Sequence, residues 1–315
     1  MKTSVILCTY NRSQSLARAL ESLASSVLPE FTDWEILVVD NNSSDQTREV
    51  TAKFCNRYPD RIRYAFEPVQ GLCNARNAGI REARGDIVAF MDDDVIVEPL
   101  WLQNLTAALY NGEWAGAGGR ILPERDFSPP RWLRLEERYA LGPLAMFDLG
   151  PEAGQLTEPP FGTNMAFRRA MFEKYGAFRT DLDRCGESML SNGDTEFGRR
   201  LLAAGERLRY EPSAVVYHPV TESRMQKTYF LNWWFGKGRS DIREFGPPPD
   251  TKWYIAGIPL VQFRRLAVWS LRWIFTVEPR LRFSRKLIVW GQVGEALEYY
   301  RYSSDVKRTH NLRAL

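Results

Sequence analysis

The chain has 315 residues, of which 44% are hydrophobic, and a formal net charge of +3 at pH 7. This length and composition predict a globular protein with a sizeable core. The small net charge and the lack of a recognisable binding motif argue against nucleic acid as a partner. The four cysteines form no C-x-x-C or Cys/His cluster, which argues against a disulfide framework or structural zinc. The sequence shows neither a secretory signal nor an uncharged apolar run of the roughly 18 residues that a membrane span needs, so we expect a cytoplasmic protein.

The first part of the sequence alternates apolar strand patterns with amphipathic helix patterns. Strands are predicted near residues 5–9, 34–39, 62–66 and 86–91, and a helical segment follows each of them. Such alternation is typical of a mostly parallel sheet that is flanked by helices on both faces. The sequence therefore predicts an α/β fold.

Three consecutive carboxylates, Asp92, Asp93 and Asp94, follow the strand predicted at 86–91. Sheets of this class place their ligands at the carboxyl ends of their strands. Because side chains alternate along an extended chain, Asp92 and Asp94 are predicted to share one side, roughly 6 to 7 Å apart, with Asp93 on the other. Adjacent carboxylates repel one another unless a cation neutralises them, so the pattern favours a divalent metal together with a phosphorylated ligand. Considered alone, the run also fits a solvated acidic turn.

Polar residues also end or follow the other predicted strands. Asp40 ends the second strand, where a carboxylate can accept hydrogen bonds from a ribose or a base N–H. Ser13, Ser44 and Asp45 instead occupy positions where each one alone is best interpreted as a helix cap. Arg76 lies in the first turn of a predicted helix and could reach a phosphate, although such an arginine is more often a surface group.

The strict alternation ends near residue 116. The following elements are predicted: a long loop over 123–155, a strand over 161–168, a helix from Asn192 or Asp194 to Gly205, and short strands over 207–210 and 214–217. The last strand leads directly to His218. A histidine at a strand end can be a third metal ligand or a pyrophosphate ligand, but a lone histidine is more often a structural hydrogen-bonding group.

Several segments between residues 3 and 220 resemble one known family in their order and spacing. They are V-I-L-C-T-Y-N-R, E-I-L-V-V-D-N-N-S-S-D, G-L-C-N-A-R-N-A-G, D-D-D, G-T-N-M-A-F-R-R, G-D-T-E-F-G-R-R-L-L-A-A-G and A-V-V-Y-H-P. Each segment is weak evidence alone, but their common order is strong evidence. The chain resembles the family 2 glycosyltransferases, inverting enzymes of GT-A type fold that take sugars from nucleotide donors. The resemblance implies that residues 1–115 form a nucleotide-sugar-binding half and residues 116–222 an acceptor-binding and catalytic-base half.

The resemblance also assigns roles to individual residues. The donor-binding residues that it implies are Thr9, Tyr10, Asn11, Arg12, Asp40, Arg76, Asp92 and Asp93. Asp92 and Asp94 would form the D-x-D pair, with Asp94, Asp92 and His218 as ligands of Mn²⁺ or Mg²⁺. Such a cation would neutralise the charge that develops on the departing nucleoside diphosphate.

Asp194 falls where the family places its catalytic base. The family often has Glu-Asp there, whereas Gly193 precedes Asp194 in this chain, so Glu196 stays open as an alternative proton acceptor. Position favours Asp194, because a helix N-terminus favours an ionised carboxylate by roughly 0.3 to 1 kcal/mol. It would take the proton of the acceptor hydroxyl during a single inverting displacement. A plain helix cap is the alternative role.

Residues 223–315 are predicted to form a basic, Trp-rich helical region. Residues 224–286 contain 13 Lys and Arg against 4 Asp and Glu, and six of the ten tryptophans lie beyond residue 221. A helix near 260–275 would carry apolar and basic residues on different sides, as helices at bilayer surfaces do. We therefore expect peripheral contact with the inner face of the membrane, with packing of these aromatics on the catalytic domain as the alternative. Arg224, Lys237 and Arg239 are candidates for a basic lid over the pyrophosphate.

Together these features predict a metal-dependent enzyme that moves one sugar from a nucleotide-diphosphate donor, by default a UDP-sugar, to an acceptor hydroxyl. A glycan or lipid-linked acceptor in cell-surface polysaccharide or glycolipid assembly is expected. The Q-x-x-R-W motif of processive synthases does not occur in the sequence, which favours transfer of single sugars. Two rivals remain: a nucleotidyltransferase acting on sugar phosphates, which would release pyrophosphate, and a non-catalytic module that binds nucleotide sugars.

Overall fold

The computed structural model describes residues 2–27, 33–124, 127–133, 135, 142–182, 184, 189–248 and 251–313, with side chains described up to residue 303. The chain divides into two compact units. The first unit comprises residues 1–127, 145–186 and 193–220, and the second comprises residues 128–144, 187–192 and 221–315.

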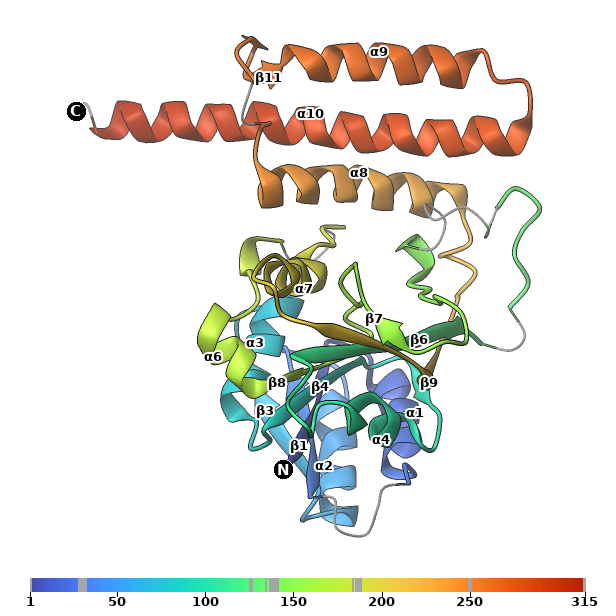
Figure 1. Ribbon diagram of the computed structural model, residues 1–315, viewed down its shortest axis with the longest axis vertical. Coiled ribbons are helices and arrows are strands. Elements are labelled where there is room, and N and C mark those ends of the chain that lie inside the picture. The colour runs from blue at the N-terminus through green and yellow to red at the C-terminus, as the bar shows by residue number, and fades with distance from the viewer. Residues whose placement is uncertain are drawn as a thin grey trace. The chain divides into compact units, whose positions relative to one another are not determined.

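A central sheet organises the first unit (Figure 1). Within the described residues its strands are β1 (Thr3–Thr9), β2 (Trp34–Asp40), β3 (Ile62–Phe66), β4 (Ile87–Asp92), β5 (Ile96–Val97), β6 (Gly116–Pro123), β7 (Gly154–Gln155), β8 (Asn164–Arg168) and β9 (Leu208–His218). Their order is β3-β2-β1-β4-β8-β6-β9-β5, with β7 beside β9. The four strands β3, β2, β1 and β4 are parallel, whereas β8 runs antiparallel to β4 and β6. The predicted α/β fold with a mostly parallel sheet is confirmed.

The helices of the first unit are α1 (Ser13–Ala24), α2 (Thr47–Arg57), α3 (Leu72–Glu82), α4 (Trp101–Ala107), α6 (Arg169–Tyr175) and α7 (Gly193–Ala203), with a 3₁₀ turn η1 (Thr180–Leu182). Right-handed crossovers place α1 and α2 together on one face, because the chain moves outward from β1 to β3. The return to β4, on the far side of β1, places α3 on the other face. The strand order thus reverses between β1 and β4, the point at which open α/β sheets bind their ligands.

A cluster of aromatic rings joins β4, β8, α6 and α7 in the core of the first unit. Phe90, Phe167, Phe172, Phe178 and Phe197 are all buried and contact one another. The rings of Phe172 and Phe197 are stacked, with centroids 4.5 Å apart. Because Phe197 lies one turn after the start of α7, this cluster fixes the N-terminus of that helix against the sheet.

Two local expectations were wrong. The segments 207–210 and 214–217 belong to one strand, β9, whose pairing with β6 shifts register between Gly119 and Arg120. In addition, β4 ends at Asp92, so Asp93 and Asp94 lie in a turn rather than on an extended strand. The alternation of side-chain directions along an extended strand therefore does not apply to Asp93 and Asp94.

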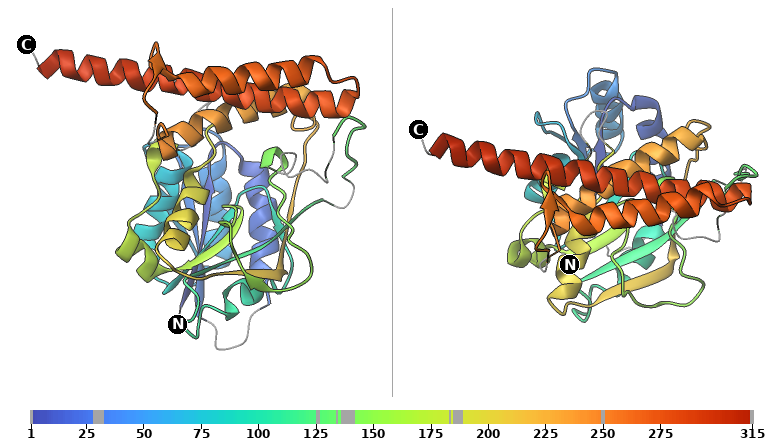
Figure 2. Two further views of the ribbon diagram at one scale, coloured as in Figure 1. Left: turned by 45° about the horizontal axis from the view of Figure 1, so that its top comes forward. Right: turned by 90° about the horizontal axis from the view of Figure 1, so that it is seen from above.

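The second unit is mainly helical. Its elements within the described residues include α8 (Lys227–Phe245), β10 (Tyr254–Ile255), β11 (Ile258–Pro259), α9 (Leu260–Ile274) and α10 (Pro279–Arg313). Helix α10 packs against both α8 and α9, and α9 runs alongside it in each view (Figures 1 and 2). Small residues permit the close approach of α8 and α10, because a Cβ atom on Gly238 would collide with the carbonyl oxygen of Gly291. None of the helices that the structure describes has the length and apolar character needed to cross a membrane.

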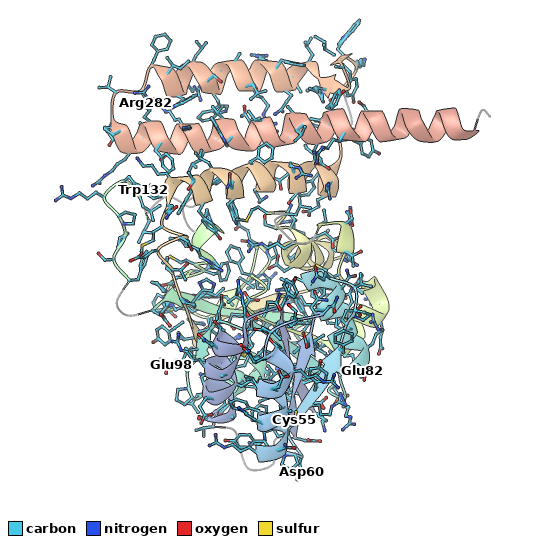
Figure 3. The ribbon with its side chains drawn as sticks, turned by 180° about the vertical axis from the view of Figure 1, so that it is seen from behind. Cys55, Asp60, Glu82, Glu98, Trp132 and Arg282 are labelled. Atoms are coloured by element: carbon cyan, nitrogen blue, oxygen red, sulfur yellow. The ribbon has the colours of Figure 1, made fainter. Side chains whose placement is uncertain are left out.

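An aromatic contact ties the segment around Trp132 to the helices of the second unit. The Trp132 ring lies edge-on to Phe230 of α8 and to Phe283 of α10, with centroid distances of 5.0 and 4.8 Å (Figure 3). Both phenylalanines are buried. Residues before α8 in the sequence therefore help to form the core of this unit.

Candidate active site

Hydrogen bonds tie together the three loops that follow β1, β2 and β3. The Asn11 side chain accepts from the backbone N–H of Ser44 (2.7 Å), while the Asn11 backbone N–H donates to Ser43 Oγ (2.9 Å). The Asn41 side chain accepts from the N–H of Gly71 (2.7 Å). Asn11 has a left-handed backbone (φ 51°), which asparagine tolerates better than most residues. The carboxyl edge of the sheet is therefore held in a defined shape.

Asp40 lies in this edge and is only 2% exposed. Its Oδ1 accepts from the Ser43 N–H (2.9 Å) and its Oδ2 accepts from the Tyr64 hydroxyl (2.9 Å). Burial and this bond to Asp40 raise the pKa of Tyr64 to about 12. In the sheet register, β1 lies between Asp40 on β2 and Asp92 on β4. The backbones of Asp40 and Asp92 are therefore two strand spacings apart, roughly 10 Å, and offset by one residue in register.

The residues predicted after β1 lie at the same edge. Thr9 ends β1 and is 3% exposed, whereas Tyr10 is 43% exposed. The guanidinium of Arg12 contacts two carboxylates, with Nη1 3.1 Å from Asp93 Oδ1 and 2.9 Å from Asp94 Oδ2. Burial alone would lower the pKa of Arg12, but these two carboxylates raise it above its usual value.

Asp92, Asp94 and His218 form a group that could hold one cation. Each offers one ligand atom, and these atoms all lie within 4.8 Å of one another. His218 is 1% exposed, and its Nε2 lies 3.8 Å from Asp94 Oδ1. Two ligands on opposite sides of a small divalent ion are roughly 4.2 Å apart, and carboxylate with imidazole is a donor set that suits Mn²⁺. The donor chemistry and spacing of these residues therefore fit one Mn²⁺ or Mg²⁺ ion.

The middle carboxylate, Asp93, has a different environment. Burial raises its pKa to about 7, against the opposing effect of Arg12. The pKa of Asp92, by contrast, is lowered, because the charge of Arg76 and a hydrogen bond from Thr163 outweigh the effect of burial. Three successive aspartates thus have distinct electrostatic surroundings, which the sequence alone does not distinguish.

Asp194 is the second residue of α7. Its Oδ2 accepts from the backbone N–H of Gly162 (2.6 Å), and its Oδ1 accepts from the N–H of Thr195 (2.8 Å). Glu196, the alternative proton acceptor, forms an ion pair with Arg200 one turn along the same helix, with an N–O distance of 2.7 Å. Asp194 and Glu196 therefore contact different parts of the first unit.

Arg76 connects Asp194 with the acidic group. This arginine is 4% exposed, and the charges of Asp194 and Asp92 raise its pKa although burial alone would lower it. Its Nη2 lies 3.6 Å from Asp92 Oδ1. On the other oxygen of Asp92, the Thr163 hydroxyl donates a hydrogen bond of 2.7 Å. Because Gly162 and Thr163 are neighbours, the segment before β8 contacts both carboxylates.

Two glycines have no space for a side chain at this site. A Cβ atom on Gly162 would lie 2.6 Å from Asp194 Oδ2 and would collide with the Arg76 guanidinium. A Cβ atom on Gly193 would collide with the sulfur of Cys73. The second collision gives a physical reason for the absence of an acidic residue before Asp194. Sequence reasoning noted Gly193 but assigned no role to Gly162 or Thr163, for which the G-T-N-M segment was the available signal.

The three residues predicted to form a basic lid belong to the second unit. Arg224 precedes α8, and Lys237 and Arg239 lie within it. Lys237 forms an ion pair with Asp241, and Arg239 forms one with Glu298 at 2.8 Å. A lid role for the three stays a prediction.

Comparison with known proteins identifies the family. The sequence model described as glycosyl transferase family 2 matches residues 4–176, which is more than half of the chain. The chain belongs to glycosyl transferase family 2. It is 30% identical over 177 residues to an uncharacterized glycosyltransferase of Nostoc sp., a match that covers 55% of this chain but only 53% of that relative. It is also 26% identical to the glucosyl-dolichyl phosphate glucuronosyltransferase of Haloferax volcanii, over 75% of each chain.

A solved structure shares the fold of this family 2 glycosyltransferase. The mannosyltransferase PcManGT of Pyrobaculum calidifontis, solved in complex with GDP-Man and Mn²⁺, aligns with a TM-score of 0.63. The alignment covers 94% of this chain and 86% of that protein at 18% sequence identity. The predicted GT-A type fold is thereby confirmed.

Proposed function

We propose that this family 2 glycosyltransferase moves one sugar, with inversion, from a nucleotide-diphosphate donor to an acceptor hydroxyl, and that it needs Mn²⁺ or Mg²⁺. One observation carries the proposal. Asp194 is connected through Arg76 and the Gly162–Thr163 segment to the Asp92–Asp94–His218 group. A proton acceptor and a cation-binding group therefore belong to one hydrogen-bonded and ion-paired network.

Asp92, Asp94 and His218 would hold the metal ion. The fit of three oxygen and nitrogen donors within 4.8 Å supports this assignment, as does the Mn²⁺ in the complex of the structurally similar PcManGT. When bound, such an ion stabilises the negative charge that develops on the departing diphosphate. Thr163 and Arg76 position Asp92 by contacts to its two oxygens. The Arg12 guanidinium does the same for Asp94 and Asp93.

Asp194 would be the base, in preference to Glu196. The N–H of Gly162 fixes the orientation of the Asp194 carboxylate, whereas the Glu196 carboxylate is bound by Arg200. The carboxylate would accept the proton of the acceptor hydroxyl as that oxygen attacks the anomeric carbon. Attack from the face opposite the leaving diphosphate inverts the anomeric configuration in one step.

The donor would lie along the edge formed by the loops after β1 and β2. The base and ribose would contact Asp40, Tyr10 and Asn11. Thr9 and Arg12 would lie between the ribose and the phosphates. Strand β1 lies between Asp40 on β2 and Asp92 on β4, so a donor that reaches from Asp40 to Asp92 would cross the end of β1. Residues 1–115 then act as the donor half, and residues 116–222 supply the base and the acceptor side.

The acceptor would be a glycan or a lipid-linked sugar in polysaccharide or glycolipid assembly. The Haloferax volcanii relative, which by its name acts on glucosyl-dolichyl phosphate, supports this class. A UDP-sugar is the default donor, but the GDP-Man in the PcManGT complex is a reason to test guanosine donors equally.

The proposal is tested by a donor-hydrolysis and transfer screen with UDP- and GDP-sugars, in the presence of Mn²⁺, of Mg²⁺, or of a chelator. We expect release of a nucleoside diphosphate from one donor class, and loss of that release in chelator. Pyrophosphate release from a nucleoside triphosphate and a sugar phosphate would instead show a nucleotidyltransferase. Turnover that persists unchanged in chelator would contradict the metal assignment.

A further inference from the structure

Helix α9 of the second unit uses one side to pack on α10. Gln262 is 1% exposed, and its side-chain amide donates to the carbonyl oxygen of Gln292 on α10 at 2.9 Å. Trp273, the penultimate residue of α9, meets Trp290 of α10 edge-on at 6.1 Å. The side of α9 that contains Gln262 and Trp273 is therefore the side that faces α10.

The opposite side of α9 carries large apolar side chains that are exposed. We call this surface the α9 face; its residues are Leu260, Phe263, Val268, Leu271, Ile274 and Phe275. At 100° per residue, Leu271 lies on the far side of the helix from Gln262 and Trp273. Leu271 is 55% exposed and Phe275 is 77% exposed. A set of large apolar residues on one surface marks an interaction site rather than ordinary scattered exposure.

The apolar surface continues beyond both ends of α9. Before the helix, the β10–β11 hairpin and the residue preceding it expose Trp253 (75%), Tyr254 and Ile255. After the helix, Val277 is 93% exposed. The hairpin contacts α9 through β11, which directly precedes that helix. Exposed apolar residues thus occur along the chain from Trp253 to Val277, and we call this set the apolar strip.

Basic residues lie within this strip and beside it. Residues 252–286 contain eight Lys and Arg against a single acidic residue. Arg264 is within the α9 face, between Leu271 and Val268 in angular position around the helix. Arg272 and Lys286 stack on tryptophans, with Arg272 4.8 Å from the Trp269 ring and Lys286 4.9 Å from that of Trp290. Arg282 lies near the start of α10, just after the turn from α9 (Figure 3).

We propose that the α9 face binds the surface of an anionic lipid bilayer. Apolar side chains would enter the boundary between headgroups and acyl chains, and the bordering cations would contact lipid phosphates. An anionic bilayer is favoured over a second copy of the chain as the partner, because two surfaces with the same excess of basic residues repel each other. This inference does not rest on the chemistry of the transfer site.

The test is flotation of the 315-residue chain with vesicles of phosphatidylcholine alone or mixed with phosphatidylglycerol. We expect the partition coefficient to be about tenfold or more higher on the anionic vesicles, and to fall as salt is added. The double variant Leu271→Glu/Ile274→Glu should lose this binding. Arg264→Glu should weaken it on anionic vesicles while leaving the apolar face intact.

Val27→Glu is the matched control, because Val27 is an apolar residue of the first unit that is 54% exposed. Its binding should equal that of the wild-type chain, and circular dichroism should show all variants folded. Absence of vesicle binding by the wild-type chain, or equal binding by the double variant, would overturn the proposal. A dimer in light scattering that the double variant dissociates, without vesicle binding, would assign the face to a second copy instead.

Discussion

The carboxyl edge of β1 and β4, which is the candidate active site, and the α9 face, which is the proposed lipid-binding surface, differ in how their side chains are held. At the edge, buried charged groups such as Arg76 and Asp92 each have partners at defined distances. On the α9 face, exposed apolar side chains such as Leu271 and Phe275 are adjacent without such directed contacts. The proposed activity of the carboxyl edge depends on exact contacts, so a single substitution there should have a large effect on activity or stability. The proposed binding by the α9 face depends on its apolar and basic composition, so the fold should tolerate a single substitution there.

The largest effect is expected at the proposed metal-binding group, Asp92, Asp94 and His218. Asp94→Asn removes a charge that faces both Arg12 and His218, and transfer should fall about 10³-fold, as when other preorganised electrostatic groups are removed. Initial rates at saturating Mn²⁺ measure this effect. Asp60→Asn is the control, because Asp60 is exposed and lies before the N-terminal end of β3, away from the carboxyl edge (Figure 3). Comparable losses in both variants would contradict the assignment.

The next effect concerns stability. Arg76→Ala leaves Asp92 and Asp194 without the cation that lies between them, and breaking a buried ion pair costs about 3–5 kcal/mol. Urea unfolding measures the loss. On the same helix, Arg81 pairs with Glu67 at the surface, so Arg81→Ala should cost no more than about 1 kcal/mol. Equal losses of unfolding free energy in Arg76→Ala and Arg81→Ala would contradict the claim that the buried network stabilises the fold more than the surface ion pair does.

A smaller effect is expected at Asp45, which accepts hydrogen bonds from the N–H groups of Ser13 and Thr47 at 3.0 Å. Although burial alone would raise its pKa, the bonds from Thr47 and Ser13 lower it to about 2. Its stabilising effect is therefore complete above the unfolded pKa of about 4 and is lost as the pH falls through 2. Asp45→Asn should cost about 1 kcal/mol at neutral pH.

The pH dependence of that cost is the decisive measurement at Asp45. Urea unfolding of the wild-type chain and of Asp45→Asn should give stabilities that converge between pH 4 and pH 2. A difference that stays constant over this range would show that the charge of Asp45 is not what stabilises the two helix starts.

The smallest effect is expected on the α9 face. Leu271→Glu should change the free energy of unfolding by no more than about 0.5 kcal/mol, because an exposed side chain loses no packing. Leu287, on the buried side of α10, is 1% exposed, and Leu287→Ala should cost about 2–5 kcal/mol. Thermal unfolding of the two variants provides the comparison. A large loss at Leu271 would mean that this side chain contributes to packing in the folded chain.

The sequence predicted the elements that depend on local patterns. Apolar runs located β1, β2 and β4, and the position of Asp194 before an amphipathic segment located the start of α7 to within a residue. The family and its fold were also correctly predicted, because several short segments kept a characteristic order. These features are encoded within short stretches of sequence.

Contacts between distant segments could not be predicted in this way. Nothing near Arg76 in the sequence indicates that its partners, Asp92 and Asp194, lie 16 and 118 positions later. Nor does the sequence indicate that Arg76 and Asp194 leave no room for a side chain at Gly162. The different environments of Asp92 and Asp93 likewise arise from Arg76 and Arg12, which only the folded sheet brings close. Burial and charge pairing at the site are properties of the tertiary structure.

The most direct test of the central claim separates donor binding from turnover in Asp194→Asn. Calorimetric titration with the preferred nucleotide sugar and Mn²⁺ should give the same dissociation constant as the wild-type chain, while transfer to the acceptor falls at least about 10²-fold, the contribution expected of a general base. In the same titration Asp94→Asn should bind donor more weakly and should lose the dependence on Mn²⁺. Near wild-type transfer by Asp194→Asn would contradict the proposal that this carboxylate receives the acceptor proton.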